Sequence, residues 1–357
     1  MNYSRRGILL AGAASMAACS MPNTSNEKDN IEGSENSASK PILPVGGYIE
    51  ETASGIEDLI DVSSPVEVIG EGYNWVEGPA WHQARNALYF SDVNDNVIYE
   101  WTTKAGVKPF ETPGGVAQEN APGKIRLGSN GLWVLPNGDM MICNHGTRAV
   151  ERFDFQTRKR TTIASTFQGK RLNSPNDVVV ASDGTVYFTD PVSGLEGANQ
   201  SPLKEQPHNG VYRVDVNGEI SLLLEDMIFP NGVSLSPDER YLYIAQSEKS
   251  EAFVRRVELL ADGGLGEDKI WFDARPFYVD GAIGNPDGMA VSKSGHLAVT
   301  GPGGIFLLTP DGKLLGRIRT KWFASNCCFG EDGQTLFITA DDYMLRVKTK
   351  MTGVQWV

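Results

Sequence analysis

The sequence predicts an all-β fold, a six-bladed β-propeller, from a repeated phrase, abundant turn residues and the absence of helical periodicity. Each phrase is a small polar pair, an apolar strand, a tight turn and a second apolar strand. The phrases are 39 to 56 residues apart and begin at Glu77, Asn130, Asn176, Asn231, Asp287 and Asn326. A propeller blade repeats every 40–50 residues or so, and six strand–turn–strand units indicate six blades.

The phrase NDVVVASDGTVYFTD, which begins at Asn176, shows how each blade is expected to form. Two apolar strands flank an Asp-Gly turn, which is a strong hairpin signal. A third strand usually follows, such as GVYRVD from Gly210, and then a fourth, such as ISLLLE from Ile220. A β-sandwich is the alternative, but six similarly punctuated repeats argue against it.

Residues 1–19 are expected to form an export signal that lies outside the fold. Arg5 and Arg6 precede an apolar run from Gly7 to Ala18, a pattern that resembles a bacterial twin-arginine signal. The run is too short to span a membrane comfortably. Its end resembles a lipoprotein cleavage box, so Cys19 is expected to be lipidated; a plain cleavable signal is the alternative. Both predict an exported, periplasmic protein, with any membrane attachment only through Cys19.

Residues 20–58 are predicted to form a polar tether, and residues 59–357 the propeller domain. The segment after Cys19 is too poor in apolar residues to bury a core. The whole chain has 40% hydrophobic and 22% charged residues, as in a soluble globular protein. Its formal net charge of −13 argues against nucleic-acid binding, which requires clustered Lys and Arg.

The leading residues of the six phrases are expected to meet at one mouth of the central channel, because the innermost strand of each blade lines it. Carboxylates and amide oxygens without His or Cys suit a hard cation such as Ca²⁺ or Mg²⁺ and argue against structural zinc or copper. Glu77 and Asp287 balance the charge of a divalent ion, and Asn176 and Asn231 add neutral oxygen ligands.

The chain resembles the gluconolactonase / regucalcin family of six-bladed propellers over about residues 60–350, and within it the exported, Zymomonas-type gluconolactonases. The phrases that carry the resemblance include WVEGPAW, SNGLWVLPNG, GKRLNSPNDVVVASDGTVYFTDP, PNGVSLSPDE and PDGMAVS. The resemblance implies a divalent metal, Ca²⁺ first with Mg²⁺, Mn²⁺ or Zn²⁺ as alternatives. The implied ligands are Glu77, Asn176, Asn231 and Asp287.

The implied reaction is hydrolysis of a sugar lactone, with D-glucono-1,5-lactone as the leading substrate and D-gluconate as the product. The metal would polarise the ring carbonyl, and Asp287 would act as the general base that activates water. Metal ligation lowers the basicity of a carboxylate, so hydroxide formed on the metal is the competing account. Phosphotriester or fluorophosphate hydrolysis, and a non-catalytic propeller that binds sugar acids or a partner protein, are the alternative functions.

Four residues are predicted to contact substrate. The regucalcin branch has a sugar-contacting Arg two positions before the ring Asn, where this chain has Ser174; that role is therefore not transferred. The predicted contacts are Asn130, Asn173, Arg171 and His145.

Further expectations concern residues around this site. Residues 192–208 form a long loop that is expected to be a lid, and Asn326 is expected only to cap its strand. His82, His208 and His296 are predicted to lie at the surface. Cys327 and Cys328 are predicted to be buried on a strand.

Overall fold

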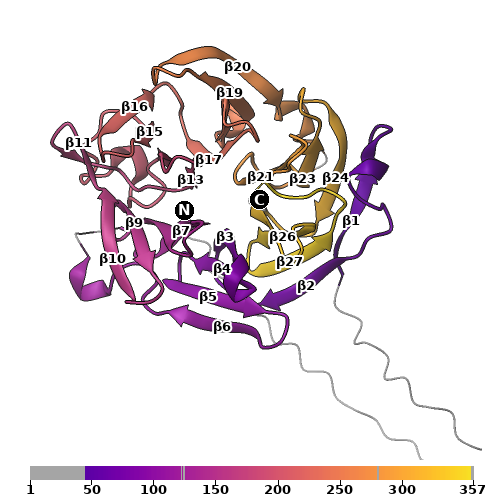
Figure 1. Cartoon of the computed structure of the whole chain (residues 1–357), viewed down its shortest axis with the longest axis horizontal. Coiled ribbons are helices and arrows are strands. Elements are labelled where there is room, and N and C mark those ends of the chain that lie inside the picture. Colours follow the sequence, from indigo (N-terminus) through magenta and orange to yellow (C-terminus); the bar gives the residue numbers. More distant parts are fainter. Residues whose placement is uncertain (1–44, 122, 124, 280, 355–357) are drawn as a thin grey trace, which may run out of the picture. The chain divides into compact units, whose positions relative to one another are not determined.

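The computed structural model describes residues 45–354 except 122, 124 and 280. The predicted signal, Cys19 and most of the predicted tether lie outside these residues. The described residues belong to one compact unit. Its fold is all-β and propeller-like (Figure 1). None of its described helices has the length and hydropathy that crossing a bilayer requires.

Four separate antiparallel sheets have four strands each, paired in chain order. The first contains β3 (Val76–His82), β4 (Ala87–Asp92), β5 (Val97–Thr102) and β6 (Gly106–Glu111). The second contains β7 (Ser129–Val134), β8 (Met140–Asn144), β9 (Ala149–Asp154) and β10 (Lys159–Ala164). The third contains β13 (Val178–Val180), β14 (Val186–Asp190), β15 (Gly210–Val214) and β16 (Ile220–Leu224). The fourth contains β17 (Pro230–Leu235), β18 (Tyr241–Gln246), β19 (Phe253–Leu259) and β20 (Leu265–Asp273).

A nine-stranded sheet contains the remaining strands except a small hairpin, β11 (Thr166–Phe167) with β12 (Lys170–Arg171). One half is β21 (Met289–Val291), β22 (Leu297–Gly301), β23 (Gly304–Leu308) and β24 (Leu314–Thr320). The other half is β25 (Ala324–Gly330), β26 (Thr335–Ala340), β27 (Tyr343–Lys348) and β2 (Val66–Glu71). β1 (Val45–Glu51) pairs with β24 on one side and β2 on the other and so joins the halves. Short 3₁₀ helices occupy the connections: Ile56–Asp58, Gln83–Arg85, Gln118–Asn120, Ala198–Gln200, Lys249–Glu251 and Arg275–Phe277.

The predicted tether, residues 20–58, extends too far. β1 and the 3₁₀ helix Ile56–Asp58 belong to the folded unit, and Ile49 and Ile56 are buried in its core. In the sequence VGGYIEE, only Gly46 and Ile49 are buried, which is too weak a pattern to predict a strand. The strand forms because the free edges of β24 and β2 both accept it.

The innermost strands contact one another in a closed cycle: β3, β7, β13, β17, β21, β25 and again β3. Hydroxyl groups also link neighbouring sheets at the start of these strands. Ser91 donates to the carbonyl of Asn130 at 2.8 Å, Thr189 to that of Asn231 at 2.7 Å, and Ser325 to that of Val76 at 2.8 Å. The starts of the innermost strands are therefore fixed relative to one another.

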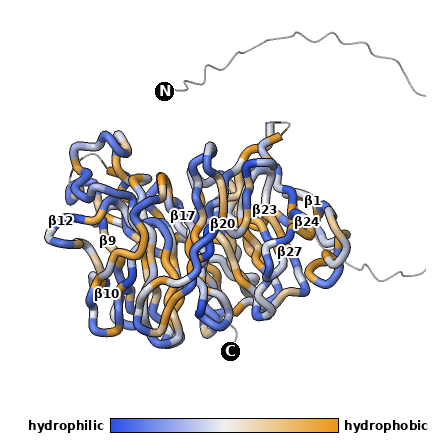
Figure 2. The backbone as a smooth tube through the Cα atoms, turned by 90° about the horizontal axis from the view of Figure 1, so that it is seen from above, coloured by the Kyte–Doolittle hydropathy of each residue, from blue (hydrophilic) through white to orange (hydrophobic). Residues whose placement is uncertain are grey.

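Apolar clusters fill the spaces between neighbouring sheets. For example, Tyr89 and Ile98 of the first sheet pack with Ile142 and Phe153 of the second. In Figure 2 hydrophobic stretches follow the strands, whereas the connecting loops and the outer strand β20 are largely hydrophilic. The core thus consists of interfaces between sheets, and the polar inner-strand starts lie apart from it.

Candidate functional site

The six residues that begin the repeated phrases are all buried, with exposed fractions of 4–7%. Glu77, Asn130, Asn231 and Asn326 lie within the first three residues of β3, β7, β17 and β25. Asn176 and Asp287 lie two residues before β13 and β21. We call these six residues the inner ring, because the strands that carry them contact one another in a closed cycle.

Three asparagines of the inner ring form a directional chain of hydrogen bonds. Asn130 Nδ2 donates to Asn176 Oδ1 at 2.7 Å, and Asn176 Nδ2 donates to Asn231 Oδ1. Asn231 Nδ2 then donates to Ser247 Oγ at 2.9 Å, and Ser247 donates to the carbonyl of Pro286 at 2.5 Å. The chain therefore connects β7 with the residue before Asp287.

The two carboxylates of the inner ring influence each other. Burial, assisted by the charge of Asp177, raises the pKa of Glu77 to about 7. Burial and the charges of Glu77 and Asp177 raise the pKa of Asp287 well above its usual range. Asn326 donates to Glu77 Oε2 at 3.3 Å, so it does more than cap its own strand. Buried carboxylates whose pKa values are raised by burial and by neighbouring negative charge form a site that a cation would stabilise.

Asp177 marks the boundary between the inner ring and the central channel. Its carboxylate accepts the backbone N–H of Val233 at 3.1 Å, and burial raises its pKa to about 6. Beside it lies a cavity of about 50 Å³ in the channel, whose lining includes the apolar residues Leu132, Val178 and Phe329. The polar chemistry is thus confined to the end of the channel where the inner strands start.

Asn173 and Arg171, two of the predicted substrate contacts, are bonded mainly to the protein backbone. Asn173 is fully buried, and its Nδ2 donates to the carbonyls of Asp190 and His208. Arg171 donates to the carbonyl of Thr147 at 2.5 Å. In the described part of the chain neither side chain is hydrogen-bonded to the inner ring, and their contact with substrate stays a prediction.

His145 is fully buried behind Asn130 and does not lie at an open mouth. Its Nε2 lies 3.4 Å from Asn130 Nδ2, which can only donate, so Nε2 acts as an acceptor. Burial and the charge of Arg126 lower its pKa to about 3, so the ring is neutral. His145 therefore orients Asn130, the first member of the asparagine chain.

The loop of residues 192–208 contacts the inner ring, as expected of a lid, but hydrogen bonds hold it in position. Ser193 donates to Asn176 Oδ1 at 3.2 Å, and the carbonyl of Gly194 accepts the backbone N–H of Arg126 at 2.7 Å. The sequence prediction missed Ser193, Ser247 and Arg126. A lone Ser or Arg in a loop carries no spacing signal that distinguishes it from other surface residues.

The cysteine prediction is confirmed, and the histidine prediction is partly wrong. Cys327 and Cys328 are buried on β25. His82 is also buried, and its ring packs edge-on against Phe155 at 4.9 Å between centroids. Its position at the end of β3, beside the next sheet, explains its burial.

Comparison with known proteins shows to which family this chain belongs. Residues 75–342 match the family model described as the SMP-30/Gluconolactonase/LRE-like region. The chain belongs to this family.

A full-length relative within the family is the gluconolactonase of Zymomonas mobilis, which is 38% identical over 354 residues and covers 98% of each chain. A solved gluconolactonase of Xanthomonas campestris is 28% identical, with a TM-score of 0.74 and coverage of 87% of this chain and 98% of that one. A calcium-binding regucalcin of Agrobacterium tumefaciens shares the fold, with a TM-score of 0.62 at 17% identity, over 79% of this chain and 94% of that one.

The inner ring of this family member fits a hard divalent cation by its donor chemistry. No group of three or more His, Cys, Asp and Glu side chains suited to a metal occurs among the described residues. The inner ring instead combines two buried carboxylates with amide oxygens, a donor set that suits Ca²⁺. Asn176 and Asn231 are hydrogen-bonded to each other, and the charge of Glu77 raises the pKa of Asp287.

Proposed function

We propose that this protein is a metal-dependent hydrolase of sugar lactones, with D-glucono-1,5-lactone as the leading substrate. The observation that carries the proposal is the pair of buried carboxylates, Glu77 and Asp287, beside the asparagine chain at the starts of the inner strands. The full-length similarity to a gluconolactonase supports it. The relatives named as gluconolactonases and the oxygen-rich inner ring of this chain both support lactone hydrolysis.

We further propose that the propeller has six blades. The nine-stranded sheet then counts as two blades, β21–β24 and β25–β27 with β2, joined at their outer edges by β1. The cyclic contacts of the six innermost strands support this count. Under this arrangement each blade contributes one residue to the inner ring.

Glu77, Asn176, Asn231 and Asp287 would hold a divalent metal ion, with Ca²⁺ as the first candidate. When bound, such an ion supplies Lewis-acid polarisation of a carbonyl oxygen. The protein would supply a matching, dehydrated environment, because all four side chains are no more than 7% exposed and electrostatic interactions are stronger where water is excluded.

Asp287 is the general base of the proposal. Without a cation, burial and the charge of Glu77 raise the pKa of its carboxylate. A bound cation would lower that pKa again, which would leave Asp287 ionised and able to take a proton from the attacking water. Its backbone is fixed by a bond from its own N–H to Thr300 Oγ1 at 2.8 Å. Asn130, held by His145, is the proposed contact for a substrate hydroxyl or a bridging water.

A pH-stat assay of the purified protein tests the proposal. The panel contains several aldonolactones and one phosphotriester, assayed before and after chelation and after adding back Ca²⁺, Mg²⁺, Mn²⁺ or Zn²⁺. The proposal predicts lactone hydrolysis that is lost on chelation and restored by a metal. Preferential turnover of the phosphotriester would replace the substrate class, and binding of sugar acids without any turnover would replace catalysis itself.

We also propose an exported, periplasmic protein that is attached to a membrane, if at all, through lipidated Cys19. Arg5, Arg6 and Cys19 in the leading segment support this proposal. Mass spectrometry of the mature N-terminus from fractionated cells tests it. A lipidated Cys19 is the expected result, and retention of the intact leading segment in the cytoplasm would contradict it.

A further inference from the structure

Arg148 is a buried arginine beside the candidate site that the proposed chemistry does not use. It follows β8, and its side chain is the largest of the fully buried side chains in the described part of the chain. Its Nε donates to two successive backbone carbonyls, those of Leu172 at 2.8 Å and Asn173 at 3.0 Å. Burying a guanidinium costs free energy unless its charge and its donors have partners. The buried position of Arg148 therefore indicates a specific role.

Asp190 binds the same segment through the segment's backbone N–H groups. It is the last residue of β14 and is fully buried. Its Oδ2 accepts the N–H of Asn173 at 2.7 Å, and its Oδ1 accepts the N–H of Ser174 at 2.8 Å. Arg148 and Asp190 also attract each other electrostatically. Two opposite charges therefore satisfy the carbonyls of Leu172 and Asn173 and the N–H groups of Asn173 and Ser174, which lie outside the strands.

This clamped segment leads directly to the inner ring. Pro175 follows Ser174, and Asn176 comes next, with its backbone N–H bonded to the carbonyl of Thr189 at 2.8 Å. The position of the Asn176 side chain is therefore fixed by bonds on both sides of Pro175. A shift of the clamp would move the central member of the asparagine chain.

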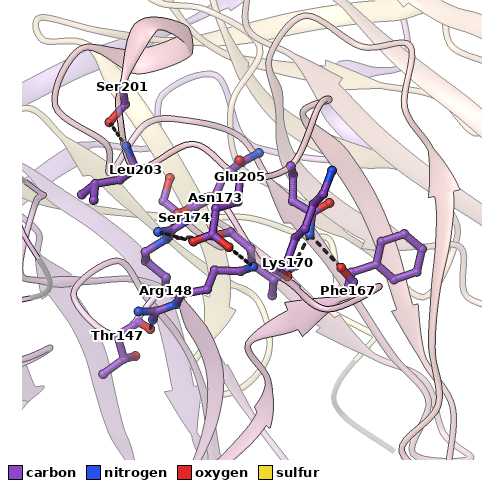
Figure 3. Close-up of polar contacts among 12 residues, drawn as sticks. Thr147, Arg148, Phe167, Lys170, Asn173, Ser174, Ser201, Leu203 and Glu205 are labelled. Atoms are coloured by element: carbon purple, nitrogen blue, oxygen red, sulfur yellow. Dashed lines mark hydrogen bonds and ion pairs between the residues drawn. The ribbon is translucent and has the colours of Figure 1, made fainter.

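Arg148 also connects this segment to the loop of residues 192–208. Its Nη1 lies 3.5 Å from Glu205 Oε1, and Glu205 Oε2 accepts the backbone N–H of Arg171 at 2.8 Å. Figure 3 shows Arg148 and Glu205 meeting beside Asn173 and Ser174. The next residue, Gln206, donates to the carbonyls of Phe167 and Lys170 at 3.0 Å each. The end of the loop is thus attached to the same clamp.

We propose that Arg148 is a positioning residue that holds Asn176 in the inner ring by clamping residues 172–174 against Asp190. The expected effect of Arg148 on catalysis rests on the proposed function, whereas its effect on the position of Asn176 does not. A planar guanidinium suits this role, because its Nε bonds the two carbonyls while its Nη1 faces Glu205, a fixed spacing that a lysine ammonium does not reproduce. Residues that orient a metal-binding group from behind typically affect metal affinity or activity by about 10- to 100-fold when changed.

Arg148→Lys and Arg148→Gln test the proposal, with Glu205→Gln as a third variant. Arg152→Gln is the matched control, because Arg152 belongs to the same sheet but is about half exposed and pairs at 3.6 Å with Asp139. Three readouts are made: the Kd for Ca²⁺ by calorimetry without substrate, hydrogen exchange at the amides of Asn173, Ser174 and Asn176, and kcat and KM for the lactone. Thermal unfolding of each variant shows whether it is folded, so that loss of the fold is not mistaken for a change in these readouts.

The expected result is a Ca²⁺ Kd weakened by about 10- to 100-fold in both Arg148 variants, faster exchange at the Asn173, Ser174 and Asn176 amides, and a comparable fall in kcat/KM. Excess Ca²⁺ should restore part of the activity at a temperature where thermal unfolding shows that both variants are already folded without it, which a role in stability alone would not produce. Arg152→Gln should match the wild type, and Glu205→Gln should show a smaller change.

Unchanged Ca²⁺ affinity and unchanged exchange at Asn176 in Arg148→Lys would overturn the proposal. If Arg148→Gln does not fold, Arg148→Lys and Glu205→Gln decide by the same criteria. If the wild type hydrolyses no lactone, the proposed function fails on that result alone. Calcium binding and hydrogen exchange then still decide whether Arg148 positions Asn176.

Discussion

The side-chain amide of Asn176 donates a hydrogen bond to the side-chain oxygen of Asn231, although the two residues lie 55 positions apart in the sequence. They begin the innermost strands of two neighbouring sheets, β13 and β17. A contact between equivalent residues of successive repeats is what a shared channel mouth requires. It is also the most direct structural support for a site built from several repeats.

Glu77→Gln should reduce activity and increase the stability of the metal-free protein. The variant removes one of two buried carboxylates whose pKa values are raised by burial and by neighbouring charge. We expect kcat/KM to fall more than about 100-fold. The free energy of unfolding at pH 8, measured by urea titration in a chelator, should rise by about 1–3 kcal/mol.

Glu100→Gln is the control for this prediction, and its stability change should have the opposite sign. Glu100 is also buried, but it accepts bonds from Tyr89 at 2.6 Å and Lys108 at 2.7 Å. Burial alone would raise its pKa, but these bonds outweigh burial and lower it. A less stable but fully active Glu100→Gln variant is expected. A destabilised Glu77→Gln variant would show that Glu77 is not a strained carboxylate.

Calcium should stabilise the wild-type protein against thermal unfolding. A ligand that binds only the folded state adds about 2.7 kcal/mol of stability at 100 times its Kd. Differential scanning calorimetry in a chelator and then in Ca²⁺ measures the shift in Tm. Asp287→Asn should abolish most of this shift, and an equal shift in that variant would place the binding site elsewhere.

His145 should make the protein less stable in mild acid. An unfolded histidine has a pKa near 6.5, whereas burial and the charge of Arg126 lower the pKa of His145 to about 3 in the folded protein. Between these values the unfolded chain binds a proton that the folded chain does not, so stability falls as the pH drops below 6.5. The loss from His145 is about 2 kcal/mol at pH 5.

His145→Gln retains an acceptor for Asn130 but cannot titrate. Urea unfolding from pH 7.5 to pH 5 should therefore show a smaller loss of stability in this variant than in the wild type. Equal slopes for the two proteins would indicate that His145 is protonated within the fold, or that another group controls the acid response.

Gly194→Ala should disturb the loop of residues 192–208 where it meets the candidate site. A Cβ atom at Gly194 would lie 2.7 Å from the Cβ of Ser174 and 2.8 Å from the Cγ of His145, both in well-packed surroundings. We expect kcat/KM to fall about 10- to 100-fold. Gln200→Ala, in the exposed part of the same loop, is the control. Wild-type kinetics for Gly194→Ala would show that this loop does not shape the site.

The sequence allowed the repeated hairpins and the inner-ring residues to be predicted, because both follow from local patterns. Paired apolar strands, a short turn between them and a polar residue at each strand start recur with every phrase. β1 was not predictable in this way, since it forms only because two sheet edges meet it. His82 was misplaced for a similar reason: its neighbour, Phe155, comes from the next sheet.

The supporting residues of the site were less predictable than the inner ring. Asn173 precedes the PND phrase and resembles a ring residue in sequence, but its amide is bonded to the carbonyls of Asp190 and His208. Arg148 follows β8, Asp190 is the last residue of β14, and the two lie 42 positions apart. Their convergence on residues 172–174 depends on the packing of two sheets and leaves no spacing signal in the chain.

The central claim is that Glu77, Asn176, Asn231 and Asp287 bind one divalent ion together. Anomalous diffraction from crystals grown with Mn²⁺, followed by refinement with Ca²⁺, tests this claim most directly. The account predicts a single strong peak with a side-chain oxygen of each of the four residues at roughly 2.3–2.6 Å for Ca²⁺. A peak bound by other residues, or an ion that contacts only one of the four, would contradict it.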